Sequence, residues 1–110
     1  MSYQHGDLAA GRWKQMLLVE RMANIGGEVE RALMWRAKNN LEYSRMAFER
    51  ALELIDLSLE YPHKRSHLKE IARLRETLVD YFSGSNEFKS TESSWRNYFL
   101  LFTYAARKNS

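Results

Sequence analysis

The chain lacks cysteine altogether and is poor in residues that interrupt helices. The absence of cysteine excludes disulfides, thiolate metal ligands and a cysteine nucleophile. One proline and five glycines in 110 residues leave long stretches without a helix breaker. β-Branched residues are few, whereas Leu, Ala, Glu, Arg and Met are common. This composition predicts an all-α protein.

Long apolar runs are also missing. The longest, Tyr98–Ala106, is interrupted by Thr103 and is far shorter than the ~20 residues that a membrane-spanning helix needs. The N-terminal segment MSYQHGDLAAGRW contains no apolar core of the signal-peptide kind. The net charge is only +3, with both signs mixed along the chain, so charge alone does not indicate nucleic-acid binding. We therefore expect a cytoplasmic protein without membrane association.

The segment Leu41–Tyr61 has the clearest helical pattern. Its charged residues recur every three or four positions and so form one narrow line along a helix. They are Glu42, Arg45, Glu49, Glu53, Asp56 and Glu60. Most of the remaining circumference is apolar and needs neighbours on two or three sides. We expect this segment to be the central helix of a small bundle.

Three further helices are expected, at about Arg12–Lys38, Ser66–Phe82 and Glu92–Arg107. The links between helices are marked by Asn39-Asn40, Pro62 and Ser83-Gly84. Short links make neighbouring helices antiparallel. The sequence therefore predicts an all-α, single-domain, up-and-down four-helix bundle over residues 1–110.

Gly26 and Gly27 stand in the middle of the first helix, where each glycine costs roughly 1 kcal/mol relative to alanine. Two interpretations are open: the helix breaks at Asn24–Gly27, or it continues and Gly26 faces a partner that approaches closely. The apolar stripe keeps its phase across the glycines, which favours one long helix. On a helical wheel of this segment, Arg21 falls on the charged side, which we expect to face solvent.

The last helix is unusually apolar for a surface element. It has one aromatic face, and the apolar residues Leu100, Leu101 and Tyr104 extend onto the flanks of that face. Such a helix lies deep in the bundle or meets another chain. In the preceding loop we expect Phe88 to fold back onto the bundle.

His63, His67 and Glu70 have a spacing that zinc or iron can use, if the third helix begins at Pro62. Neighbouring cations disfavour a metal ion, and no second cluster completes a site. The acidic line of Leu41–Tyr61 has no Glu-x-x-His motif, so we interpret it as a solvated face or a dock for a basic partner. We predict no metal and no other cofactor.

The densest basic patch lies at the start of the third helix, at Lys64, Arg65, Lys69 and Arg73. A phosphate or RNA contact is one interpretation, because a helix N-terminus adds partial positive charge. A solvated basic turn is the other, since the patch contains no aromatic residue for base stacking.

Trp35 falls among charged residues on the helical wheel, next to Arg31. An exposed tryptophan beside arginine is typical of contact surfaces. With Tyr104 of the last helix, these residues are the candidate protein interface.

The segment from about Val29 to Tyr61, EVERALMWRAKNNLEYSRMAFERALELIDLSLEY, resembles the first hairpin of small HEPN-type helical proteins. The shared elements are a charged helix ending at Gly or Asn, a tyrosine, an alanine-rich segment and a leucine-rich helix. The resemblance implies a ribonuclease toxin or the partner of a nucleotidyltransferase. The family's ribonuclease motif has an arginine several residues before a histidine. No arginine stands in that relation to His63 or His67, which puts ribonuclease activity in doubt.

Gly-rich phosphate loops, serine–histidine–acid arrangements and nucleophile elbows are absent as motifs. The sequence therefore favours a non-catalytic helical bundle that acts through protein–protein contacts and self-associates. The alternative is a HEPN-like RNA- or nucleotide-binding component, paired with a nucleotidyltransferase and lacking the ribonuclease motif.

Overall fold

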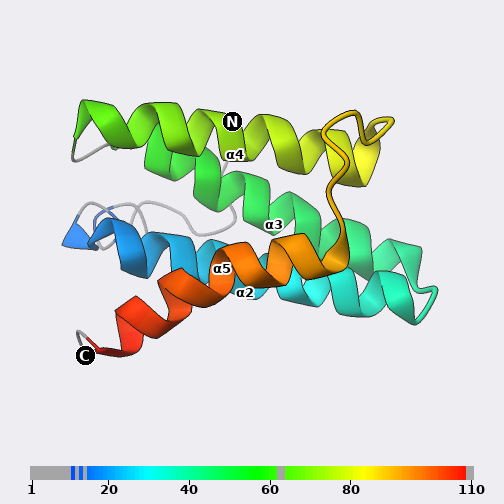
Figure 1. The fold of residues 1–110 in the computed structure, drawn as a ribbon. Coiled ribbons are helices and arrows are strands. Elements are labelled where there is room, and N and C mark those ends of the chain that lie inside the picture. Colours follow the sequence, from blue (N-terminus) through cyan, green and yellow to red (C-terminus); the bar gives the residue numbers. More distant parts are fainter. Residues whose placement is uncertain (1–10, 12, 14, 62–63, 109–110) are drawn as a thin grey trace.

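Four long helices follow one another in an up-and-down arrangement. The structure, a computed structural model, describes residues 11, 13, 15–61 and 64–108. Its helices are α2 (Leu18–Ala37), α3 (Leu41–Glu60), α4 (Arg65–Ser83) and α5 (Glu92–Lys108). Each runs antiparallel to the one before it (Figure 1). The predicted all-α four-helix bundle is confirmed. None of these helices combines the length and the apolar character needed to cross a membrane.

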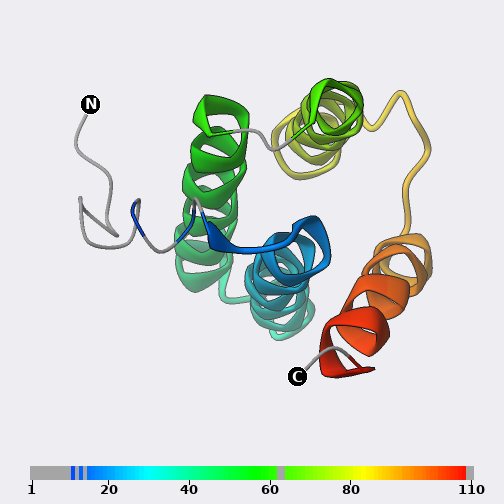
Figure 2. The same cartoon turned by 90° about the vertical axis from the view of Figure 1, so that its left-hand side faces the viewer.

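Two helices, α2 and α3, share the middle of the bundle. Helix α2 packs against α3 on one side and α5 on the other, and α3 packs against α2 and α4. The end-on view shows α2 between α3 and α5 (Figure 2). The first turns of α3 expose Leu41, Tyr43 and Met46. The expectation that Leu41–Tyr61 would be the central helix is right in that α3 has neighbours on two sides, but α2 holds an equivalent position.

Helix α2 continues without a break through Gly26 and Gly27. A Cβ atom at Gly26 would lie 2.8 Å from Cδ1 and 2.9 Å from Cβ of Phe99 in α5. A Cβ at Gly27 would meet nothing within 4 Å. The prediction of one long helix, with Gly26 facing a closely approaching partner, is confirmed. Gly26 lets the α5 backbone come nearer than any side chain would allow.

The beginning of α2 differs from expectation. The helix starts at Leu18, not near Arg12, and Leu17 is its extended N-cap. Arg21 is buried, and its guanidinium donates hydrogen bonds to the carbonyls of Met16 (3.2 Å) and Tyr61 (2.6 Å). Its predicted place on the solvent side was wrong. The carbonyls at the end of α3 and before α2 meet here and need a donor.

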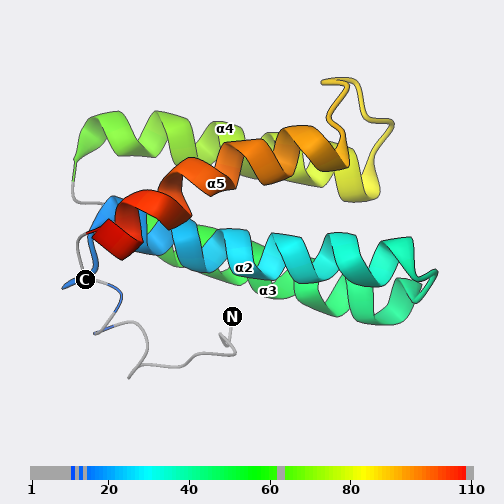
Figure 3. The ribbon, with the colours of Figure 1, turned by 60° about the horizontal axis from the view of Figure 1, so that its bottom comes forward.

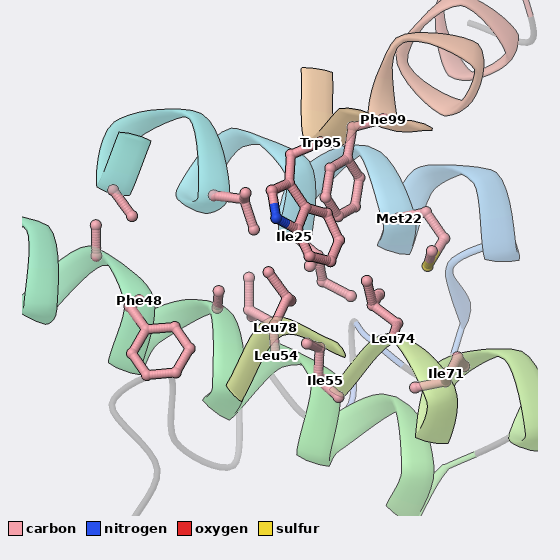
Figure 4. Packing of buried hydrophobic residues seen from close by; sticks show 14 of the residues in the cluster. Met22, Ile25, Phe48, Leu54, Ile55, Ile71, Leu74, Leu78, Trp95 and Phe99 are labelled. Carbon is pink, nitrogen blue, oxygen red and sulfur yellow. The ribbon is translucent and has the colours of Figure 1, made fainter. Parts of the chain in front are cut away.

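The core is formed by all four helices (Figure 4). Its larger members are Met22, Ile25, Phe48, Leu54, Ile55, Ile71, Leu74, Leu78, Trp95 and Phe99. Trp95 and Phe99 project together from α5 into this cluster. Trp13, ahead of α2, is also buried, and its Nε1 donates to Ser58 Oγ at 2.8 Å. The core therefore fixes which side of α5 faces inward.

The loop between α4 and α5 is held by hydrogen bonds instead of by a buried ring. The side chain of Phe88 is 50% exposed, so the expectation that it folds back onto the bundle was wrong. The backbone N–H groups of Glu87 and Phe88 donate to the Asp80 carboxylate at 2.8 and 3.1 Å. At the end of the loop, the Ser94 N–H donates to Thr91 Oγ1 at 3.0 Å, which caps α5.

We expect Gly26→Ala and Gly27→Ala to change the free energy of unfolding in opposite directions. Gly27→Ala should stabilise the protein by about 0.5–1 kcal/mol, because alanine favours helix and its Cβ meets open space. Gly26→Ala should destabilise it by about 1–3 kcal/mol, because the Cβ of Phe99 cannot turn away by a change of rotamer. Urea unfolding measures both variants. Equal effects would contradict the close α2–α5 approach.

Candidate binding groove between α4 and α5

An open groove of about 610 Å³ lies between α4 and α5. The two helices are neighbours in sequence, but α4 packs mainly on α3 and α5 on α2, so their backbones stay apart along the seam. Leu74, Trp95 and Tyr98 supply the groove's apolar surface. Its polar lining residues are Ser66, Lys69, Glu70, Arg73, Thr77, Ser90 and Ser94. The bundle is thus incompletely closed on this one side.

The predicted basic patch runs along the α4 side of this groove. Arg65, Lys69 and Arg73 are four residues apart, so they form one line on the helix, and Lys64 is its N-cap. All four are exposed, and no carboxylate of the described residues lies within ion-pair distance of them. Lys69 and Arg73 line the groove directly. The structure therefore brings the four predicted residues together.

Cations elsewhere in the described helices are engaged. Arg75 pairs with Asp56 at 2.8 Å, and Arg96 pairs with Glu30 at 2.9 Å. Each of the remaining cations pairs with a carboxylate, donates to a backbone carbonyl, lies over an aromatic ring or makes a further contact. These cations are Arg21, Arg31, Arg36, Lys38, Arg45, Arg50, Arg107 and Lys108. Unpaired positive charge on the described helices is therefore concentrated at the groove.

Tyr98 and Glu70 connect the two helices across the groove. The Tyr98 hydroxyl donates to Glu70 Oε1 at 3.1 Å. Burial raises the pKa of Tyr98 far above its ordinary value, and the Glu70 charge and hydrogen bond raise it further. Tyr98 therefore stays neutral, and Glu70 has a partner within the protein.

Two of the groove's four serine and threonine hydroxyls are engaged as well. Thr77 Oγ1 donates to the Arg73 carbonyl at 2.8 Å, and Ser94 Oγ donates to the Thr91 carbonyl at 2.9 Å. Trp95 Nε1 is buried without a hydrogen-bond partner among the described residues. The groups left to act on a ligand are thus the apolar surface, the cations Lys69 and Arg73, and the hydroxyls of Ser66 and Ser90. This combination suits an apolar body that carries negative charge.

The other chemical candidates gain no support. His63 lies outside the described residues, Glu70 is bound to Tyr98, and no cluster of three His, Asp or Glu in the described part could hold a metal ion. The acidic line on α3 is partly neutralised, since Glu49 pairs with Arg45 and Asp56 with Arg75. We interpret it as a charged outer face of α3.

The three predicted interface residues do not form one patch. Trp35 was predicted to be exposed but is half-buried; its ring lies edge-on to Tyr43, with centroids 5.0 Å apart. Arg31 pairs with Glu28 on the same helix. Tyr104 is exposed near the end of α5, at the end of the bundle where α2 begins (Figure 3). Trp35, close to the end of α2, is therefore at the other end of the bundle.

Sequence reasoning placed Leu100 and Leu101 on flanks without proposing a role for them. They are 62% and 73% exposed, and Tyr104 is 60% exposed. Their spacing puts all three on the side of α5 opposite Trp95 and Phe99. Sequence reasoning also missed that Trp95 and Tyr98 line the same groove as the basic patch. The available signal was that α5 is apolar on two opposite sides.

Comparison of the chain with protein-family models, curated proteins and solved structures gave no match. The resemblance to HEPN-type proteins therefore stays a prediction.

We expect the stability of the protein to fall as the pH rises above about 10, and to fall less in Tyr98→Phe. The pKa of Tyr98 is higher in the folded than in the unfolded state. The folded state therefore keeps a proton that the unfolded state releases, so this stability is full below the unfolded pKa and is lost as the pH rises. Urea unfolding between about pH 9 and pH 11 measures the slope. Tyr43→Phe, at an exposed position, is the control and should keep the wild-type slope.

Proposed function

We propose that this protein is a non-catalytic binding module that self-associates through the outward side of α5. The observation that carries the proposal is the strip of Leu100, Leu101 and Tyr104, three large apolar side chains exposed next to one another on one helix. Contiguous exposed apolar patches are typical of contact surfaces on soluble proteins. The inward side of α5 already fills the core with Trp95 and Phe99, so folding does not need the strip.

The surroundings of the strip support a contact with a second helix. A shallow groove of about 440 Å³ along the α2–α5 seam is lined by Ala23, Gly27 and Leu100. It provides a concave surface next to protruding side chains. Two copies of α5 crossing antiparallel, with a two-fold axis between Leu100 and Leu101, would place Tyr104 opposite Asn97 of the second copy. Closed two-fold contacts of this kind are the commonest form of self-association.

The alternative, an RNA- or nucleotide-binding component, is less well supported. The unpaired cations of α4 favour contact with phosphates. Binding of unpaired bases also relies on exposed aromatic faces. Trp95 is only 5% exposed, and Tyr98 is partly buried and hydrogen-bonded to Glu70. The groove therefore offers charge for a phosphate without a stacking surface for a base.

We expect sedimentation velocity to show a concentration-dependent dimer that Leu101→Glu converts to a monomer. A carboxylate in the centre of the strip would have to lose its hydration in the dimer, and two copies would repel each other. Circular dichroism should show an unchanged fold, because Leu101 is 73% exposed. The dissociation constant should rise at least about tenfold, which corresponds to about 1.4 kcal/mol.

Two control substitutions test whether the effect belongs to this strip. Met46→Glu adds the same charge at another exposed apolar position, on α3. Trp35→Ala removes the aromatic ring that sequence reasoning favoured as an interface. Both should leave sedimentation unchanged. A wild-type protein that stays monomeric at high concentration would overturn the proposal, and loss of association only in Trp35→Ala would move the interface to the α2–α3 end.

A further inference from the structure

We propose that the groove between α4 and α5 is a second binding surface, which receives an acidic amphipathic helix of a partner protein. The groove lies on another side of α5 from the strip of Leu100, Leu101 and Tyr104, so this inference does not depend on self-association.

Charge complementarity identifies the sign of the partner. Lys69 and Arg73 line the groove, and Arg65 continues the line toward the start of α4. The other cations of the described helices have partners; outside the helices, Lys64 adjoins this line and Lys89 is an exposed cation of the α4–α5 loop. Repulsion between like charges four residues apart destabilises a helix slightly. Carboxylates placed along this line would remove that repulsion and form new ion pairs.

The apolar surface identifies the rest of the partner's chemistry. Leu74, Trp95 and Tyr98 give the groove a predominantly apolar interior. The hydroxyls of Thr77, Ser94 and Tyr98 already donate within the protein. A small polar ligand such as a nucleotide would find only the hydroxyls of Ser66 and Ser90 as directed donors here besides the two cations. A ligand with an apolar side and an acidic edge matches what remains.

The shape of the groove favours a helix over an extended peptide. From Ser66 to Thr77 the α4 side covers roughly 16 Å at 1.5 Å per residue, which is about three helical turns. An extended segment over apolar side chains would leave its backbone N–H and C=O groups unpaired, because the described part of the chain has no strand edge to pair with. A helix satisfies its own backbone, and placing an apolar helix face in an apolar groove is a common mode of peptide recognition.

The test uses the full chain and a displayed library of three-turn to four-turn helical peptides. Apolar positions are fixed as leucine along one face, and the flanking positions are varied among Glu, Gln and Lys. We expect selection to enrich Glu over Lys at the positions beside the leucine face. Binding of a labelled selected peptide, followed by fluorescence anisotropy, should weaken as the salt concentration rises.

Matched variants place the peptide in the groove. Lys69→Glu combined with Arg73→Glu should weaken binding by about tenfold or more, because two attractive contacts become repulsive. Lys38→Glu with Arg45→Glu makes the same change in net charge at distant exposed positions and should change affinity less than about twofold. Thr77→Trp fills the groove and should also weaken binding. Circular dichroism establishes that each variant is folded.

The outcomes separate this proposal from its competitors. Leu101→Glu should keep the peptide affinity even where it abolishes self-association, so either proposal can fail alone. No enrichment, enrichment without acidic residues, or binding that survives both groove variants would overturn the acidic-helix assignment. A single-stranded oligouridine that binds more tightly than any selected peptide, and is lost in Lys69→Glu/Arg73→Glu, would assign the groove to nucleic acid instead.

Discussion

The contact of Phe99 with Gly26 decides how the whole of α5 is presented. Phe99 lies where the Cβ of any other residue at position 26 would be, so the two backbones approach closely at this point. Because the backbones approach in this way, the side chains of Trp95 and Phe99 lie in the core. Because side chains on a helix have fixed relative directions, Tyr98 must then lie at the α4 seam and Leu101 must point outward. Both proposed binding surfaces follow from this one contact.

Much of the fold could be predicted from the sequence, because it depends on properties of single helices. Helical periodicity predicted four helices, and an unbroken stripe predicted a continuous helix through Gly26. The failures involve relations between helices. Arg21 is charged but buried, because carbonyls from another helix need its guanidinium. Phe88 is apolar but exposed, because Asp80 holds its turn through the backbone. A helical wheel represents neither kind of partner.

The candidate groove was predictable only in part, for the same reason. Its cations lie close together in sequence, so the patch at Lys64–Arg73 could be found without a structure. Most of its apolar surface, Trp95 and Tyr98, comes from α5, more than twenty residues further along the chain. The sequence suggested that the patch had no aromatic neighbour, whereas the fold places Trp95 and Tyr98 in the same groove. Which cations lack a partner is likewise a property of the folded protein alone.

The distribution of charge argues that the groove was not shaped by stability alone. The chain has three more Lys and Arg than Asp and Glu, and the described helices concentrate their unpaired cations on one side of α4. Spreading that charge would favour folding, since Arg65, Lys69 and Arg73 repel one another along the helix. The same seam keeps α4 away from α5, so that apolar surface of Leu74, Trp95 and Tyr98 lines an open groove. Local features that oppose folding and occur together are expected where a protein binds something, because the bound partner supplies the missing interactions.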